Sequence, residues 1–274
     1  NKLFHRKPLR EFFSMKRFLR DLVKYRRYML YSAKAQLKNE VAGSFLNWLW
    51  WILDPLLFML VYTFVYSIVF GRSQDYLCAF IFLGYCSWEF FNRSVKQSVK
   101  LVKKYKSVLS KVYLPKFILI ISSMLVNGFK MLISLGIVVI TMAVYRIPPS
   151  LTMLWAIPFL LLLFLLTFGF SCWLLHFGVF FEDLANIVNV VLRLLFYMSG
   201  IFYNPEQQLT GIVRYCMIRL NPTCYIITQL RNTVLYAQPP LWHWLILWAV
   251  IGAAVSACGV ALIYRYERRY VKSV

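Results

Sequence analysis

Long apolar runs separated by short polar or basic stretches dominate the chain. Crossing the hydrocarbon core of a bilayer takes about 20 helical residues, so runs of this length are candidate membrane spans. Six such runs lie at about 46–70, 76–93, 117–145, 151–178, 185–203 and 241–264. The pattern predicts an all-α integral membrane protein with a single transmembrane domain over residues 1–274, in which 46–264 form a six-span bundle.

Residues 15–41 do not form a continuous apolar run. Apolar side chains recur there every three or four positions, with basic side chains between them. This amphipathic pattern predicts a helix within an N-terminal segment, 1–45, that lies on the membrane surface. Packing of the helix against a protein partner is the alternative. The predicted apolar stripe consists of Phe18, Leu22, Tyr25, Met29, Ala33 and Leu37.

The stretch 204–240 is too long for a tight turn and too apolar for a free loop. Asn204-Pro205 and Asn221-Pro222 each resemble a helix start, with Asn as the cap and Pro in the first turn. Helices of about 12–15 residues would be too short to span a bilayer. We therefore expect two short re-entrant helices in the outer leaflet.

Composition and charge agree with a membrane protein. Hydrophobic residues make up 61% and charged residues 15%, whereas soluble domains have about 25% charged residues. The net charge of +21 is concentrated at 1–40, 93–116 and the predicted tail 265–274. Basic blocks between spans are typical of cytoplasmic loops, so we expect both termini in the cytoplasm and no nucleic-acid partner. The blocks would also face anionic membrane lipids.

The six cysteines are scattered and include no C-x-x-C pair, so the sequence predicts no metal site. A bridge between Cys216 and Cys224 is an alternative to their being apolar fillers. The chain has no Walker-type phosphate loop. Asp54 and Glu89 are each expected to stand alone within their spans. We expect a non-enzymatic chain whose energy comes from a partner.

Charges and aromatic rings within spans are candidates for a substrate path. Arg193 and Tyr197 share a face of the fifth run, and an Arg beside aromatic rings suits a sugar–phosphate chain. Inter-helix pairing or snorkelling is the alternative for Arg193, and packing is the alternative for the rings. The aromatic face of the first run consists of Trp51, Phe58, Tyr62 and Tyr66. Gly252 and Ser256 have the spacing of a close helix contact.

Several ordered segments resemble the membrane-spanning subunits of bacterial ABC exporters for O-antigen, capsule and teichoic acid polymers. The segment FLNWLWWILDPLL at 45–57 is similar to the first-span motif of that family, which usually has Asn at the position of Asp54. KVYLPK at 111–116 resembles the end of its first inner loop, and VFFED at 179–183 resembles its second, where Arg is more usual than Glu182. SGIFY at 199–203 and LNPT at 220–223 are also similar to family segments.

The resemblance implies a homodimer in the bacterial cytoplasmic membrane that works with two copies of a separate ATPase. ATP and Mg²⁺ would bind that ATPase, and this chain would bind no cofactor. A lipid-linked polymer would pass outward between the protomers, mainly along the first and fifth spans. The residues implied in coupling to the ATPase are Lys106, Lys111, Tyr113, Leu114, Pro115, Glu182 and Asp183.

Three other functions compete with polymer export. A drug or small-lipid exporter is disfavoured by the short outer loops. A membrane-embedded glycosyl- or acyltransferase would need a His, Asp or Glu cluster at one membrane face, and an ion channel would need a repeated polar filter segment. The sequence contains neither pattern. The identity of the polymer is left open at this stage.

Overall fold

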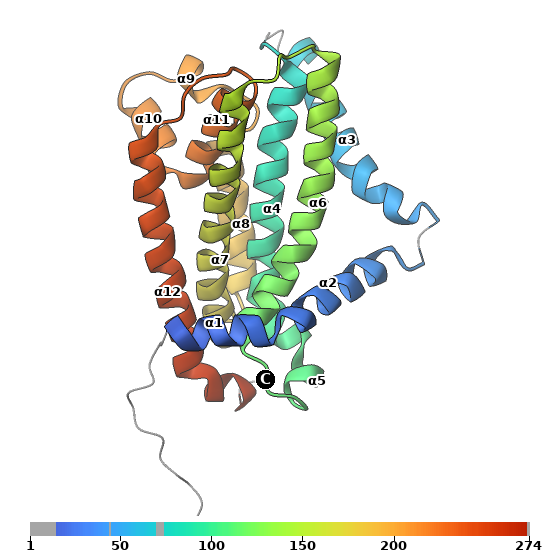
Figure 1. The fold of residues 1–274 in the computed structure, drawn as a ribbon, viewed down its shortest axis with the longest axis vertical. Coiled ribbons are helices and arrows are strands. Elements are labelled where there is room, and N and C mark those ends of the chain that lie inside the picture. Colours follow the sequence, from blue (N-terminus) through green and yellow to red (C-terminus); the bar gives the residue numbers. More distant parts are fainter. Residues whose placement is uncertain (1–14, 44, 70–73, 273–274) are drawn as a thin grey trace, which may run out of the picture.

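The computed structural model of the chain describes residues 15–43, 45–69 and 74–272. Every regular element in these ranges is a helix, and the long helices stand side by side as a bundle (Figure 1). Most of the connection between the first two predicted spans, the first part of segment 1–45 and the end of the predicted tail lie outside the described residues.

All six predicted spans fold as helices. In the described residues, four segments are long and apolar enough to cross a membrane, namely Trp50–Ile68, Lys116–Val144, Leu151–Phe180 and Trp242–Glu267. The bundle consists of α3 (Trp50–Phe64) with the π-helical η2 (Val65–Val69), α4 (Leu77–Lys104), α6 (Lys116–Val144), α7 (Ala156–Phe180), α8 (Leu184–Met198) and α12 (Trp242–Lys272). The short 3₁₀ helices η1 (Asn47–Leu49) and η3 (Leu151–Trp155) precede α3 and α7.

Helix α4 forms the centre of the bundle. It packs against α3, α6, α7, α8 and α11 (Pro222–Val234), so most of its side chains are buried from Ala79 to Val102. The predicted span ended at 93, and the helix extends beyond that point. The helix continues to Lys104 because Val95, Val99 and Val102 are still covered by neighbouring helices. A short helix, α5 (Lys106–Leu109), follows it.

Small residues bring α7 and α12 together. A Cβ atom placed on Gly169 would lie 2.9 Å from the Ser256 hydroxyl, and one on Gly259 would lie 2.7 Å from the Cβ of Cys172. Ser256 also donates a hydrogen bond of 3.1 Å to the carbonyl of Leu165. The close contact predicted from Gly252 and Ser256 is therefore confirmed, and α7 is the helix that fills it.

The N-terminal amphipathic segment forms two helices, α1 (Met15–Lys24) and α2 (Arg26–Val41), which run across one end of the bundle (Figure 1). The predicted apolar stripe packs on the bundle, and the position of the segment at the membrane surface stays a prediction. Met29 and Ala33 are buried, and the Phe18 ring lies 5.0 Å from that of Phe117 on α6, because the bundle itself covers the stripe. Other apolar side chains point outward from these helices, namely Leu19, Val23, Leu30 and Tyr31.

The segment 204–240 lies at the opposite end of the bundle (Figure 1). Its second predicted helix is α11, with 13 residues. The first predicted helix is broken into α9 (Pro205–Gln208), α10 (Gly211–Tyr215) and the π-helical η4 (Cys216–Leu220). The break follows Leu209 and Thr210, whose backbones are extended, and Gly211 then takes a positive φ of +60°. All six cysteines are free, including Cys216 and Cys224.

Helix α12 does not stop at the predicted boundary of 264. It continues through the predicted tail to Lys272, and Tyr270 is almost fully buried, with its hydroxyl 2.6 Å from His176 Nδ1 on α7. Packing on α7 holds this extension in place. The α12 end, α1, α5 and residues 110–115 and 181–183 together form what we call the basic end of the bundle.

Candidate functional site: the basic end and its polar network

Tyr113 stands at the centre of a polar network at the basic end. Its hydroxyl donates a hydrogen bond of 2.9 Å to Glu267 Oε2 on α12 and accepts one of 3.2 Å from Arg17 Nη2 on α1. Burial and the neighbouring Glu267 carboxylate raise the pKa of Tyr113 to about 12, so the phenol stays protonated at neutral pH and can donate. One side chain thereby connects α1, the loop before α6 and α12.

Further charged groups close the network. Glu267 also receives the ammonium of Lys116, 3.7 Å from Oε1, and the Lys116 side chain is only 4% exposed. Arg17 lies 3.8 Å from Asp21 and stacks over the Tyr264 ring at 4.3 Å. The α1–α12 network, as we call it, consists of Arg17, Asp21, Tyr113, Lys116, Tyr264 and Glu267.

The residues of the first loop implied in coupling divide into two groups. Lys106, Lys111 and Tyr113 are exposed, whereas Leu114 and Pro115 are buried beneath them. The buried pair anchors the loop to the bundle, and the exposed residues remain accessible to a partner. Val112 is also 60% exposed, which places an apolar side chain among the lysines.

The second loop lies beside the end of α4. Lys103 Nζ is 3.3 Å from Glu182 Oε1, and both side chains are well exposed. Asp183 is the N-cap residue of α8 and is exposed as well, as is the ring of Phe181. The two loops therefore meet at the basic end, linked through α4. Their role in coupling stays a prediction.

The aromatic residues predicted along the substrate path pack largely within the protomer. The Phe58 ring stacks on Tyr85 of α4 at 3.6 Å, and Tyr62 stacks on Phe202 at 4.3 Å. Tyr66 is buried and accepts a hydrogen bond of 3.1 Å from Gln208. Trp51 lies edge-on to Phe129, with ring centres 5.8 Å apart.

Arg193 and Tyr197 lie together on the exposed side of α8, as the spacing predicted. This face does not continue to Gly200 and Asn204, because α8 ends at Met198 and both residues are buried. Apolar side chains surround the two residues on the exposed side, namely Ile187, Val190, Val191, Leu194 and Met198.

An unpredicted residue, Arg231, sets the end of α8. It is 2% exposed and donates hydrogen bonds to the carbonyls of Gly200, Ile201 and Phe80 at 2.6, 2.7 and 2.9 Å. The carbonyls of Gly200 and Ile201 follow the last turn of α8, and Arg231 satisfies them where the chain turns, with Gly200 at a φ of +66°. Arg231 is the single charged residue of α11, and this charge was the signal available in the sequence.

Asn caps order the same end of the bundle, as predicted. The Asn204 side chain accepts from the backbone N–H of Glu206, one residue after Pro205. The Asn221 side chain accepts from the N–H groups of Thr223 and Cys224, with Pro222 in the first turn of α11. Both starts are therefore Asn-capped with Pro in the first turn.

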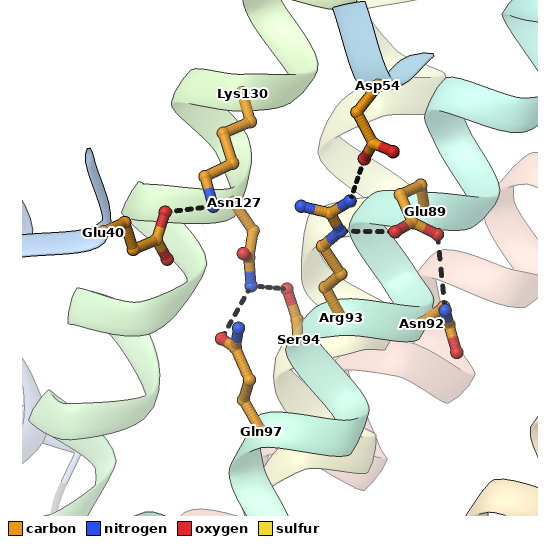
Figure 2. Close-up of polar contacts among 9 residues, drawn as sticks. All are labelled: Glu40, Asp54, Glu89, Asn92, Arg93, Ser94, Gln97, Asn127 and Lys130. Atoms are coloured by element: carbon orange, nitrogen blue, oxygen red, sulfur yellow. Dashed lines mark hydrogen bonds and ion pairs between the residues drawn. The ribbon is translucent and has the colours of Figure 1, made fainter. Parts of the chain in front are cut away.

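The two acids that were expected to stand alone, Asp54 and Glu89, both form ion pairs. Arg93 reaches from α4 to Asp54 on α3 at 2.8 Å and also contacts Glu89 one turn away (Figure 2). Lys130 on α6 pairs with Glu40 at the end of α2 in the same view. The expectation of lone carboxylates was wrong because Glu89 and Arg93 lie one turn apart on α4, and the packing of α3 on α4 brings Asp54 to the same guanidinium. Within the described ranges, no three His, Cys, Asp or Glu side chains gather as a metal site.

Comparisons with known proteins agree with a transport subunit. Residues 29–235 match the family model described as ABC-2 type transporter. An O-antigen export system permease protein RfbA of Klebsiella pneumoniae is 24% identical over 241 residues, covering 86% of this chain and 90% of the relative. Its namesake in Myxococcus xanthus is 28% identical over 215 residues, covering 78% and 83%.

Permeases are transport subunits rather than enzymes, and several apolar helices here suit a multi-pass membrane protein. The match covers α2 to α11 and includes both loops of the basic end. The chain therefore belongs to the ABC-2 type transporter family, whose permeases work with an ATPase partner.

Proposed function

We propose that the chain is the transmembrane subunit of an ATP-driven exporter that moves a lipid-linked polysaccharide of the O-antigen type outward. The observation that carries the proposal is the similarity to permeases named for O-antigen export over most of both chains. Those names favour O-antigen over teichoic acid, the other polymer class that the sequence left open.

In this proposal α3, α4, α6, α7, α8 and α12 cross the bacterial inner membrane, and both termini are cytoplasmic. The support is that α1 and the end of α12 lie at the same end of the bundle as the lysine-rich residues 96–116 (Figure 1). Basic segments stay on the cytoplasmic side. At the opposite end, α9 to α11 are too short to cross and form re-entrant structure in the outer leaflet.

Two copies would associate through α3 and α8, with the polymer path between them. Both helices pack on α4 and leave strongly apolar outward faces, with Val61 57% and Leu194 60% exposed. Such a face suits lipid or a second protomer. Arg193 and Tyr197 on the exposed side of α8 would then face the path.

The ATPase would dock on the basic end and bind the ATP and Mg²⁺ there. The exposed residues Lys111, Tyr113 and Glu182 offer charge of both signs, and Val112 and Phe181 offer apolar anchors. Docking that differs in affinity between two states of the ATPase would shift the conformation of the permease. The α1–α12 network would carry that shift to α1 and α12.

Two experiments test the proposal: deletion of the gene that encodes this chain, and purification of the tagged chain with its partners. We expect a tagged chain to co-purify with a soluble ATPase, and we expect deletion to remove surface polysaccharide while lipid-linked polymer accumulates inside. The proposal would be contradicted if the tagged chain purified without an ATPase and if the deletion strain kept its surface polysaccharide unchanged.

A further inference from the structure

A cavity of about 630 Å³ with charged and amide side chains in its lining lies within one protomer. It is bounded by the end of α2 and by α3, α4 and α6, with Lys130 on one side and Arg93 on the other (Figure 2). Its volume falls in the range of small-molecule binding sites. Polar cavities at membrane depth are costly and tend to be functional.

Each of the two cations beside the cavity is paired with one or two carboxylates. Arg93 is held from behind by Asp54 and Glu89, and Lys130 is held by Glu40. The Arg93 guanidinium and the Lys130 ammonium therefore lie toward the space between α4 and α6 (Figure 2). Three carboxylates against two cations leave one net negative charge, which opposes the entry of a phosphate.

Neutral hydrogen-bonding groups occupy the floor. The Asn127 amide donates to Ser94 Oγ at 3.0 Å and to Gln97 Oε1 at 3.1 Å (Figure 2). Asn127 is 2% exposed, and its Oδ1 is buried without a hydrogen-bond partner. A buried acceptor with no donor is unfavourable, so a small shift of the Asn127 amide toward the cavity would let this atom accept from a hydroxyl of a ligand or from a water.

Aromatic rings complete the lining. Trp50, Trp51 and Tyr85 border the cavity, and Trp50 is 46% exposed. An aromatic ring covers the apolar face of a sugar ring, while mixed donors and acceptors match its hydroxyls. An uncharged sugar is the ligand chemistry that suits the rings, the amides and the net charge together.

We propose that this cavity binds an uncharged sugar ring carried by a lipid. The inference rests on the proposed function, because the sugar nearest the lipid anchor of the exported polymer is one source of this ligand. A resident membrane glycolipid is the other source with the same chemistry. Trp50 would cover one face of the ring, and Gln97 and Asn127 would bond its hydroxyls.

The test is binding to the purified complex, in a detergent without a sugar head group, measured by native mass spectrometry. The probes are a dihexosyl diacylglycerol, a plain diacylglycerol and a phosphatidylglycerol with the same acyl chains. We expect the dihexosyl lipid to bind about tenfold more tightly than the other two, a difference of the size that one good contact set provides. Equal binding of all three lipids would overturn the proposal.

Variants locate the site. We expect Trp50→Ala and Gln97→Leu each to weaken binding of the dihexosyl lipid about fivefold. Trp48→Ala is the matched control, because Trp48 is 59% exposed two residues away and does not line the cavity. An equal loss in Trp48→Ala, or no loss in either cavity variant, would overturn the assignment of the site.

Two further readouts distinguish the exported polymer from a resident glycolipid as the source of the sugar, and the cavity proposal from the proposed function. Displacement of the dihexosyl lipid by purified lipid-linked polymer supports the substrate as the source, and its failure overturns that source in favour of a resident glycolipid. Export by the wild-type complex is measured in parallel. Export without sugar-selective binding rejects the cavity proposal alone, whereas binding without export in any condition rejects the proposed function.

Discussion

The hydroxyl of Tyr113 donates a hydrogen bond to the Glu267 carboxylate at 2.9 Å, although 154 residues separate the two in sequence. The contact ties a short loop at the basic end to the last turns of α12. Arg17 on α1 reaches both side chains, at 3.2 Å from the Tyr113 hydroxyl and 3.7 Å from the carboxylate. A force on this loop therefore acts on both ends of the described chain.

Tyr113→Phe removes only the hydroxyl from the α1–α12 network. A hydrogen bond to a charged group contributes about 1.5–3 kcal/mol, so we expect transport per hydrolysed ATP to fall about threefold or more. Transport and ATP hydrolysis are measured on the same reconstituted complex. Tyr105→Phe, at the junction of α4 and α5, is the control and should leave the ratio unchanged. An unaltered ratio in Tyr113→Phe would remove Tyr113 from the coupling path.

Glu182→Gln tests the second loop. The Lys103–Glu182 pair is exposed, so its loss should change the free energy of unfolding by less than about 1 kcal/mol. We expect normal membrane insertion and an unchanged melting temperature, together with weaker capture of the ATPase on a pull-down. If the variant binds the ATPase and exports polymer as the wild type does, Glu182 lies outside the docking surface.

Glu267→Gln leaves the ammonium of Lys116 with a weakened partner in a nearly buried position. Removing one partner of such a pair costs up to about 3–5 kcal/mol, and the partly exposed Glu267 reduces that figure. We expect a lower melting temperature in detergent. Adding Lys116→Met to Glu267→Gln should restore part of the loss. Additive losses in the double variant would show that the two charges do not interact.

Arg231→Met should be among the most damaging changes in the chain. It leaves the carbonyls of Gly200 and Ile201, which lie outside any helix, without this donor, each costing about 1–3 kcal/mol. Gly84→Ala should act similarly, because its Cβ would lie 2.3 Å from Arg231 Nη2. We expect little monodisperse protein by size-exclusion chromatography from either variant. Gly136→Ala is the control, since nothing lies within 4 Å of its Cβ. Normal yields from Arg231→Met would refute its structural role.

Hydropathy and capping patterns predicted the parts of the fold that depend on local sequence. The helical spans and the Asn caps at Asn204 and Asn221 follow from composition and from side-chain bonds within two or three residues. The end of α8 could not be predicted in this way, since Arg231 fixes it from 31 residues beyond Gly200. A local pattern carries no information on such a bond.

The partners that charged groups find on other helices were equally beyond the sequence. Asp54 and Arg93 are 39 residues apart, and their contact depends on how α3 lies against α4. The stripe on α1 and α2 was read correctly as apolar, but the bundle that covers it could not be identified, because a membrane and a helix bundle favour the same side chains. The α1–α12 network joins three segments that no single sequence motif contains.

The proposed function is the movement of lipid-linked polysaccharide across a membrane, driven by ATP hydrolysis. The most direct measurement reconstitutes the chain and its ATPase in vesicles, with lipid-linked polymer supplied on the side of the ATPase, and follows the polymer with a lectin on the opposite side. We expect polymer to appear there with ATP and not with a non-hydrolysable analogue. Sustained ATP hydrolysis with no polymer reaching the far side would contradict it.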